Sequence, residues 1–117
     1  MTYMTDKSPK TELLPGTLDM LILKTLSIGV MHGYGIAQHI QRVSKDVLLV
    51  QEGSLYPALQ RMQVKGWITS EWRKSSTGRK ARFYKLTAAG RRQLGEETTS
   101  FERSITAITR VLRNAES

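Results

Sequence analysis

Positive charge is concentrated in one short part of this chain of 117 residues. Eight of its 18 lysines and arginines fall within residues 71–92, where Glu71 is the one acidic residue. A nucleic acid is the partner that such a cluster favours, because each phosphate neutralised by a cation releases counterions. The formal net charge of +8 gives the whole chain the same attraction for polyanions.

The cations lie on a predicted β-hairpin. Residues 67–74 (WITSEWRK) and 81–86 (ARFYKL) alternate as strands do, and Gly78 supplies the turn between them. We expect Trp67 and Trp72 to pack within the protein rather than to stack on bases. The candidates for contact with phosphates or a minor groove are Lys74, Arg79, Lys80 and Arg82. A hairpin that is charged only for solubility is the alternative.

Apolar residues at helical spacing predict three helices before this hairpin, at about 17–28, 34–44 and 52–66. Pro57 is tolerated only near the first turn of a helix, which places the start of the third one. Three helices, a two-stranded hairpin and a long final helix form the order of a winged helix-turn-helix. The predicted fold class is therefore mainly α with a small β-hairpin, plus a long C-terminal dimerisation helix.

In a winged helix-turn-helix the third helix enters the major groove of DNA. Its face opposite Leu55, Leu59 and Met62 carries Ser54, Tyr56, Pro57, Gln60 and Arg61. We expect the first four in or beside the groove, with Gln60 able to read adenine and Arg61 to hold a phosphate. An ordinary solvated face is the alternative.

Tyr34 begins the second helix, where its hydroxyl and the free backbone N–H groups of the helix start could hold a phosphate. Its ring could instead pack in the core. Both interpretations are consistent with the sequence.

The final helix is predicted from the cap Thr87 to about Arg113. Its apolar stripe has no other element of the chain long enough to cover it, which predicts a homodimer. A second apolar stripe on the first helix is expected to receive the final helix of the partner. The predicted dimer residues are Met20, Leu23, Leu94, Phe101, Ile105, Ile108 and Leu112.

Phe101 has two interpretations. It could line a cavity between subunits for a small hydrophobic ligand, or it could be an ordinary dimer-core residue. The latter is favoured because residues 88–117 contain no tryptophan that could act as a large aromatic clamp.

The predicted organisation is a mobile tail (1–12), a winged helix-turn-helix domain (13–87) and a dimerisation helix (88–117). No run approaches the roughly 18 apolar residues that span a bilayer, and the polar N-terminus lacks a signal-peptide core, so we expect a cytoplasmic protein. Cysteine is absent, and His32 and His39 lack partners for a metal site. No nucleophile–base–carboxylate set is visible. We therefore expect no metal, no cofactor and no enzymatic activity.

The chain also resembles the PadR family of bacterial transcriptional regulators, over roughly residues 14–112. The resemblance rests on HGYGIAQHI at 32–40, GSLYPALQRMQVKGWI at 53–68, SEW at 70–72 and RKARFYKLTAAG at 79–90. With a single helix as its C-terminal part, the chain is similar to the compact subgroup of the family. The resemblance implies a dimer, usually a repressor, on operator DNA, and in some members a phenolic or drug-like ligand near the dimer axis.

Two other functions are compatible with the same residues. One is a winged-helix protein-interaction module with a basic wing and no operator, which would lack a steep dependence of binding on salt. The other is a nonspecific architectural DNA-binding protein, which would show that dependence but little preference for any sequence.

Overall fold

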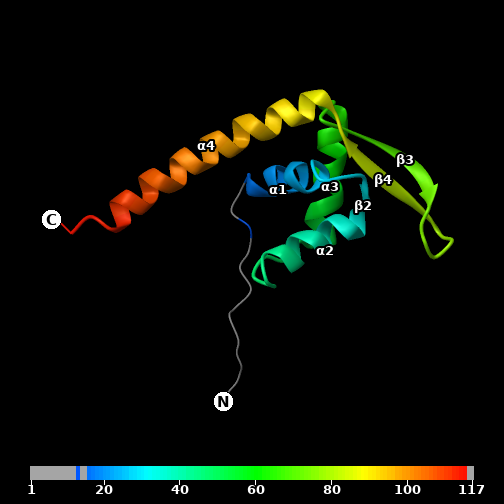
Figure 1. Ribbon diagram of the computed structural model, residues 1–117, viewed down its shortest axis with the longest axis horizontal. Helices are drawn as coiled ribbons and strands as arrows, with labels where there is room; N and C mark the ends of the chain where they lie inside the picture. Colours follow the sequence, from blue (N-terminus) through cyan, green and yellow to red (C-terminus); the bar gives the residue numbers. More distant parts are fainter. Residues whose placement is uncertain (1–12, 14–15, 116–117) are drawn as a thin grey trace, which may run out of the picture.

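The structure is a computed structural model that describes residue 13 and residues 16–115 (Figure 1). The predicted tail, residues 1–12, lies outside these described residues. The elements in chain order are α1 (Thr17–Leu26), β2 (Met31–His32), α2 (Gly33–Val43), α3 (Glu52–Val64), β3 (Ile68–Lys74), β4 (Lys80–Leu86) and α4 (Ala88–Leu112). The mainly helical winged-helix prediction is confirmed.

The sheet has three antiparallel strands in the order β2-β4-β3, rather than the two of the predicted hairpin. In the hairpin the pairing runs from Ile68 opposite Leu86 to Lys74 opposite Lys80. The third strand, β2, pairs Met31 with Tyr84 of β4. It was missing from the prediction because two residues are too few to show the alternation that identifies a strand.

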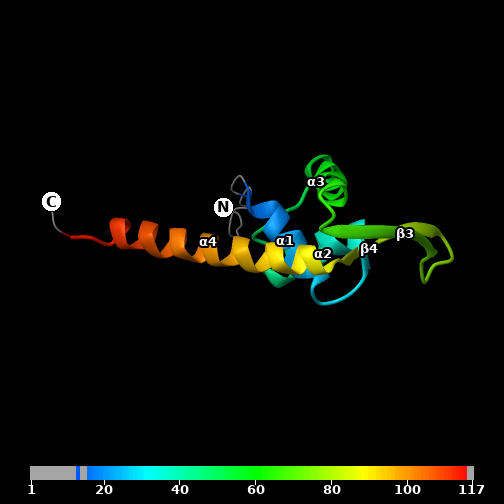
Figure 2. The ribbon, with the colours of Figure 1, turned by 90° about the horizontal axis from the view of Figure 1, so that it is seen from above.

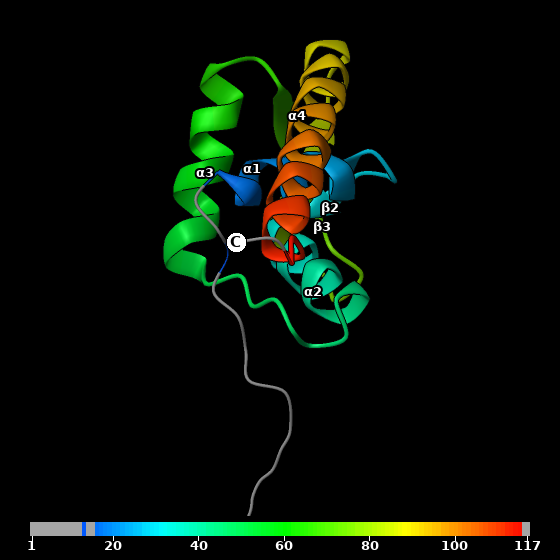
Figure 3. The same cartoon turned by 90° about the vertical axis from the view of Figure 1, so that its left-hand side faces the viewer.

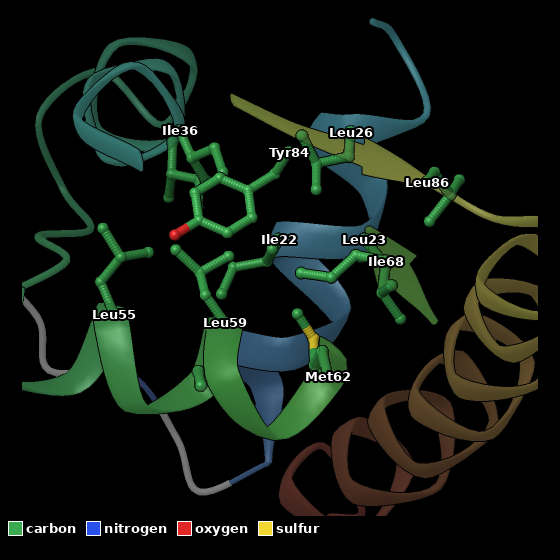
Figure 4. Close-up of a cluster of buried hydrophobic side chains, with 12 residues drawn as sticks. Ile22, Leu23, Leu26, Ile36, Leu55, Leu59, Met62, Ile68, Tyr84 and Leu86 are labelled. Atoms are coloured by element: carbon green, nitrogen blue, oxygen red, sulfur yellow. The ribbon is translucent and has the colours of Figure 1, made fainter. Parts of the chain in front are cut away.

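The hydrophobic core lies between the first three helices and one face of the sheet (Figure 4). Tyr84 and Leu86 of β4 close it on the sheet side. Its largest fully buried side chains are Ile22, Leu23, Ile36, Leu55, Leu59, Met62 and Ile68. Because apolar side chains from five elements pack together here, α3 is held with one face fixed inward and the other left to solvent.

Leu23 corrects one of the predicted dimer contacts. Its side chain is 0% exposed in the core of its own chain, so the prediction that it belongs to an outward stripe is wrong. The beginning of α4 packs against α1 in the same chain, and Leu94 is half-buried against the same core. Viewed from the free end of α4, α1 lies between α3 and α4 (Figure 3).

Thr87 joins the start of α4 to the segment that leaves α3. Its Oγ1 accepts a hydrogen bond from the Gly90 N–H at 3.0 Å, which confirms the predicted cap. The same hydroxyl lies within donating distance of the Gly66 carbonyl (2.7 Å) and the Trp67 carbonyl (2.9 Å). The backbone N–H of Thr87 also donates to the Trp67 carbonyl. The direction of α4 is therefore fixed by polar contacts to residues that directly follow α3.

The distal half of α4 projects away from the rest of the protein, at the end opposite the hairpin (Figure 2). Ile105 and Ile108 are 39% and 52% exposed there, and Val111 and Leu112 are more exposed still. None of the other described elements covers this stripe. Within the described residues, no helix is long and apolar enough to cross a membrane.

Candidate nucleic-acid interface

The outer face of α3 is open to solvent along its length. Leu55, Leu59 and Met62 point into the core together with Ala58, and the positions on the opposite side of the helix are exposed. The exposed positions include all five side chains that the sequence placed on this face: Ser54, Tyr56, Pro57, Gln60 and Arg61. The structure therefore presents these side chains together on one side of a helix whose other side is anchored.

Arg61 differs from the other four because it already has a partner. Its Nη2 lies 2.9 Å from Oδ1 of Asp19 on α1, in an ion pair that is largely open on the arginine side. Exposed pairs of this kind contribute about 1 kcal/mol or less to stability. The pair nevertheless connects α3 to α1. Contact between Arg61 and a phosphate remains a prediction, and it would require sharing or breaking this bond.

The two tyrosines of the predicted interface lie near each other at the start of α2. Tyr34 is 58% exposed, so the alternative that its ring packs in the core is wrong. Tyr56 reaches from α3 to the backbone of Gly33. A Cβ atom on Gly33 would lie 2.8 Å from Cε1 of the Tyr56 ring, which is closer than real contacts allow. Glycine at position 33 thus lets Tyr56 bridge the two helices.

The two faces of the hairpin differ in chemistry. Cross-strand partners point to the same side of an antiparallel pair, and successive residues alternate. The core face accordingly begins with the buried pair Ile68 and Leu86. It continues outward as Ser70 with Tyr84, Trp72 with Arg82, and Lys74 with Lys80. Three of the four predicted wing cations, Lys74, Lys80 and Arg82, therefore share this core face.

On the opposite face of the hairpin, a positive charge is paired with an acidic side chain. Arg73 donates a 2.6 Å hydrogen bond to Glu71 and lies 5.5 Å from the centre of the Phe83 ring. In contrast, no ion pair joins Lys74 or Lys80 to an acidic side chain in the described part of the chain. The fourth predicted cation, Arg79, lies in the turn, where its carbonyl accepts from the Ser75 N–H.

A recess lies where the core face of the hairpin meets the starts of α2 and α3. Its volume is about 380 Å³, and its lining residues are His32, Gly33, Tyr34, Tyr56, Trp72, Ala81, Arg82 and Tyr84. Arg82 is held in place by a 2.9 Å bond from its Nε to Ser70 and by stacking 5.4 Å from the centre of the Trp72 ring. Burial raises the pKa of Tyr84, against the lowering effect of Arg82, so this phenol stays neutral.

Trp72 corrects the expectation that both tryptophans pack inside the protein. Trp67 is half-buried against the core, but Trp72 is 62% exposed at the edge of this recess. The register explains the difference, since Trp72 lies on the core face two pairs beyond the last buried pair. Sequence alternation identifies the face of a strand, but not the point along the strand at which the core ends.

A second hollow, of about 460 Å³, lies between α1 and α4. Phe101, half-buried, lines it together with Met20, Trp67 and Gln93. Asp19, the partner of Arg61, also lies at its edge. The hollow therefore combines apolar side chains with a residue that contacts α3.

Comparison with known proteins agrees with this arrangement. The model of the "Transcriptional regulator PadR-like family" matches residues 22–96, more than half of the chain. A transcriptional regulator of Mycobacterium tuberculosis is 36% identical over 72 residues, which cover 62% of this chain and 64% of that protein.

Solved structures share the fold. A PadR-like transcriptional regulator from Bacillus cereus aligns with a TM-score of 0.72 at 31% identity, covering 85% of this chain and 94% of that one. Bacillus subtilis PadR in complex with operator DNA aligns with a TM-score of 0.63 at 24% identity, over 70% of this chain and 47% of that one. At that identity the second likeness shows the fold alone.

Proposed function

Because this chain belongs to the PadR-like family of transcriptional regulators, we propose that it is a homodimeric repressor that binds a specific operator in the bacterial cytoplasm. The family is one of regulators rather than enzymes, in agreement with the sequence. The observation that carries the proposal is the core face of the hairpin, which carries Lys74, Lys80 and Arg82 and meets the open face of α3 in the recess that Arg82 shares with Tyr56. A duplex against that side would meet cations and groove-reading groups together.

Each part of this surface has a proposed role. Gln60 reads a base edge in the major groove, with Ser54, Tyr56 and Pro57 in or beside the groove. Tyr34 and the wing cations, including Arg79, bind phosphates. Arg61 supports α3 through Asp19 and reaches a phosphate only if that pair opens.

Dimerisation is proposed to cover the exposed stripe of distal α4. Phe101, Ile105, Ile108 and Leu112 lie on that stripe, and Met20 lies beside Phe101 at the hollow. Two chains joined in this way would present two α3 helices to half-sites about 34 Å apart, one turn of DNA.

We further propose that a small hydrophobic compound could bind near Phe101 and relieve repression. The hollow of about 460 Å³ is within the usual size of ligand sites. A ligand there would touch Asp19 and could disturb its bond to Arg61 on α3. Changed spacing of the two recognition helices would then weaken operator binding.

The test is binding to the DNA upstream of the protein's own gene, compared with random duplex of equal length across a salt series. The proposal predicts tight binding that falls steeply with salt and prefers the upstream DNA. Equal affinity for both duplexes would favour an architectural DNA-binding protein or an operator located elsewhere. No binding at low salt would favour a protein-interaction module.

The same assay tests the wing with variants of equal charge. Lys74→Ala/Lys80→Ala removes two cations from the core face and is expected to lower the slope of log affinity against log salt by about 2. Arg73→Ala/Lys85→Ala removes two cations from the opposite face and is the matched control, because these side chains point away from the proposed duplex. Equal slopes for the two variants would contradict the proposed side of contact.

Gly33→Ala is expected to weaken operator binding about tenfold. The new methyl group would push the outer end of the Tyr56 ring out of its position between α2 and α3. Gly29→Ala is the control, since a Cβ atom there meets nothing within 4 Å. Fluorescence anisotropy with labelled operator measures the affinities. An unchanged affinity for Gly33→Ala would show that the position of Tyr56 does not matter for binding.

A further inference from the structure

Trp72 is the largest side chain of the proposed DNA-facing surface that the roles above leave unused. A tryptophan that is 62% exposed leaves a large apolar area in water, an area that usually drives packing or binding. The Arg82 guanidinium lies 5.4 Å from the centre of the Trp72 ring and donates a hydrogen bond to Ser70. The aromatic ring and the cation therefore lie together as one unit on the wing.

The recess beside this unit has the chemistry of an anion site with an apolar wall. Arg82 supplies a fixed positive charge, and Tyr34 and Tyr56 supply hydroxyl groups. Tyr84 adds no negative charge, because a phenol is neutral at neutral pH and burial raises the pKa of this one further. None of the residues that line the recess is acidic, and Glu71, which precedes Trp72 on β3, lies on the opposite face of the hairpin.

The openness of the recess favours a polymer over a small molecule. Tyr34, Tyr56 and Trp72 are all more than two-fifths exposed, whereas pockets for small ligands usually enclose most of the ligand surface. The recess joins Tyr56 on the exposed face of α3 to Trp72 and Arg82, and the lysine pair follows these two on the same face of the hairpin. A DNA strand that contacts α3 and the lysines would therefore pass beside the recess.

We propose that this recess binds one sugar–phosphate unit of the DNA backbone, with Trp72 packed on the deoxyribose and Arg82 on the phosphate. The inference rests on the proposed DNA-binding function and adds Trp72 to it as an apolar contact residue. Trp72 would act through shape and apolar contact. Arg82 would then contact one particular phosphate, rather than contribute only to the long-range electrostatic attraction between protein and DNA.

The chain has two tryptophans, which permits a direct test. Trp67→Phe leaves Trp72 as the sole fluorescent tryptophan, and Trp72→Phe leaves Trp67. With saturating upstream duplex, acrylamide quenching of Trp72 is expected to fall severalfold, whereas quenching of Trp67 stays nearly constant. If Trp72 remains equally quenchable with DNA bound, the inference is overturned, and the recess would be left to a protein or small-molecule partner.

Affinity measurements with the full-length protein complete the test. Trp72→Ala is expected to bind the duplex about tenfold more weakly, because the apolar contact with the sugar is lost, and Trp72→Phe to retain most of the affinity. The melting temperature of Trp72→Ala should be nearly that of the wild type, because the Trp72 side chain is exposed. Wild-type affinity for Trp72→Ala, together with weakened binding by Lys74→Ala/Lys80→Ala, would overturn this inference and leave the proposed function intact.

The phosphate itself can be neutralised one position at a time. A methylphosphonate at the bound position should weaken wild-type binding and have little further effect on Arg82→Gln. If no single position shows this coupling, the inference fails for Arg82. If the wild-type protein binds no DNA at all, the inference and the proposed function fail together.

Discussion

Replacing Gly90 with alanine is expected to destabilise the protein by about 3 kcal/mol or more, the upper part of the range for overpacking. A Cβ atom at this position would collide with the backbone carbonyl of Trp67 and with the side chain of Leu86. The carbonyl cannot move freely, because it accepts hydrogen bonds from Thr87 at the start of α4. We expect a fall in melting temperature of roughly 10–20 °C, measured by circular dichroism.

Gly95→Ala provides the control on the same helix. A Cβ atom there meets nothing within 4 Å, and alanine is favoured over glycine inside a helix by about 1 kcal/mol. The control variant should therefore melt at the same temperature or slightly higher. If Gly90→Ala were as stable as Gly95→Ala, the close docking of α4 on the segment after α3 could not be correct.

Ile105→Asp/Ile108→Asp is expected to convert the protein into a monomer and to weaken operator binding at least about 100-fold. Two carboxylates on the distal stripe of α4 would have to be desolvated in a dimer interface, which disfavours association strongly. The loss of affinity follows because two linked recognition helices bind with far greater avidity than one. Sedimentation velocity measures the assembly state, and anisotropy with the operator measures binding.

Thr106→Asp/Ala107→Asp adds the same charge on the opposite side of α4, where both positions are exposed. This control should remain dimeric and bind DNA nearly as well as the wild type. Far-UV circular dichroism should show helix in both variants, since none of the four side chains is buried within the chain. A dimer that survives Ile105→Asp/Ile108→Asp would exclude the distal stripe as the interface.

The features that the sequence predicts well are those that depend on interactions between residues close together in the chain. Thr87 at the start of α4 and Gly78 in the hairpin turn each act within a few residues, and the structure finds both in the predicted roles. The inward positions of α3 follow from helical spacing alone, and Leu55, Leu59 and Met62 are buried as expected. The outer face of α3 was predicted as the set of positions that remain once these inward positions are assigned.

The features that sequence did not predict depend on contacts between distant segments. Leu23 was expected to face a partner, but α1 is already enclosed within its own chain. The bond from Arg61 to Asp19 joins residues 42 positions apart, and no spacing pattern in the sequence predicts such a pair. Exposure of Trp72 depends on where the core ends beneath the hairpin. Each of these facts required the packing of the whole chain.

The alternation along the hairpin also limits which insertions and deletions this protein could tolerate. Ile68 closes the core and Lys74 carries charge on the same face of one strand. Both stay on that face only while their positions in the chain differ by an even number. One residue added within β3 would turn every side chain beyond it to the other face and carry Trp72 or Lys74 away from Arg82 and Lys80. Residues added in the turn around Gly78 would leave both faces unchanged. Length variation among natural relatives should therefore accumulate at the tip of the hairpin and be rare within its strands.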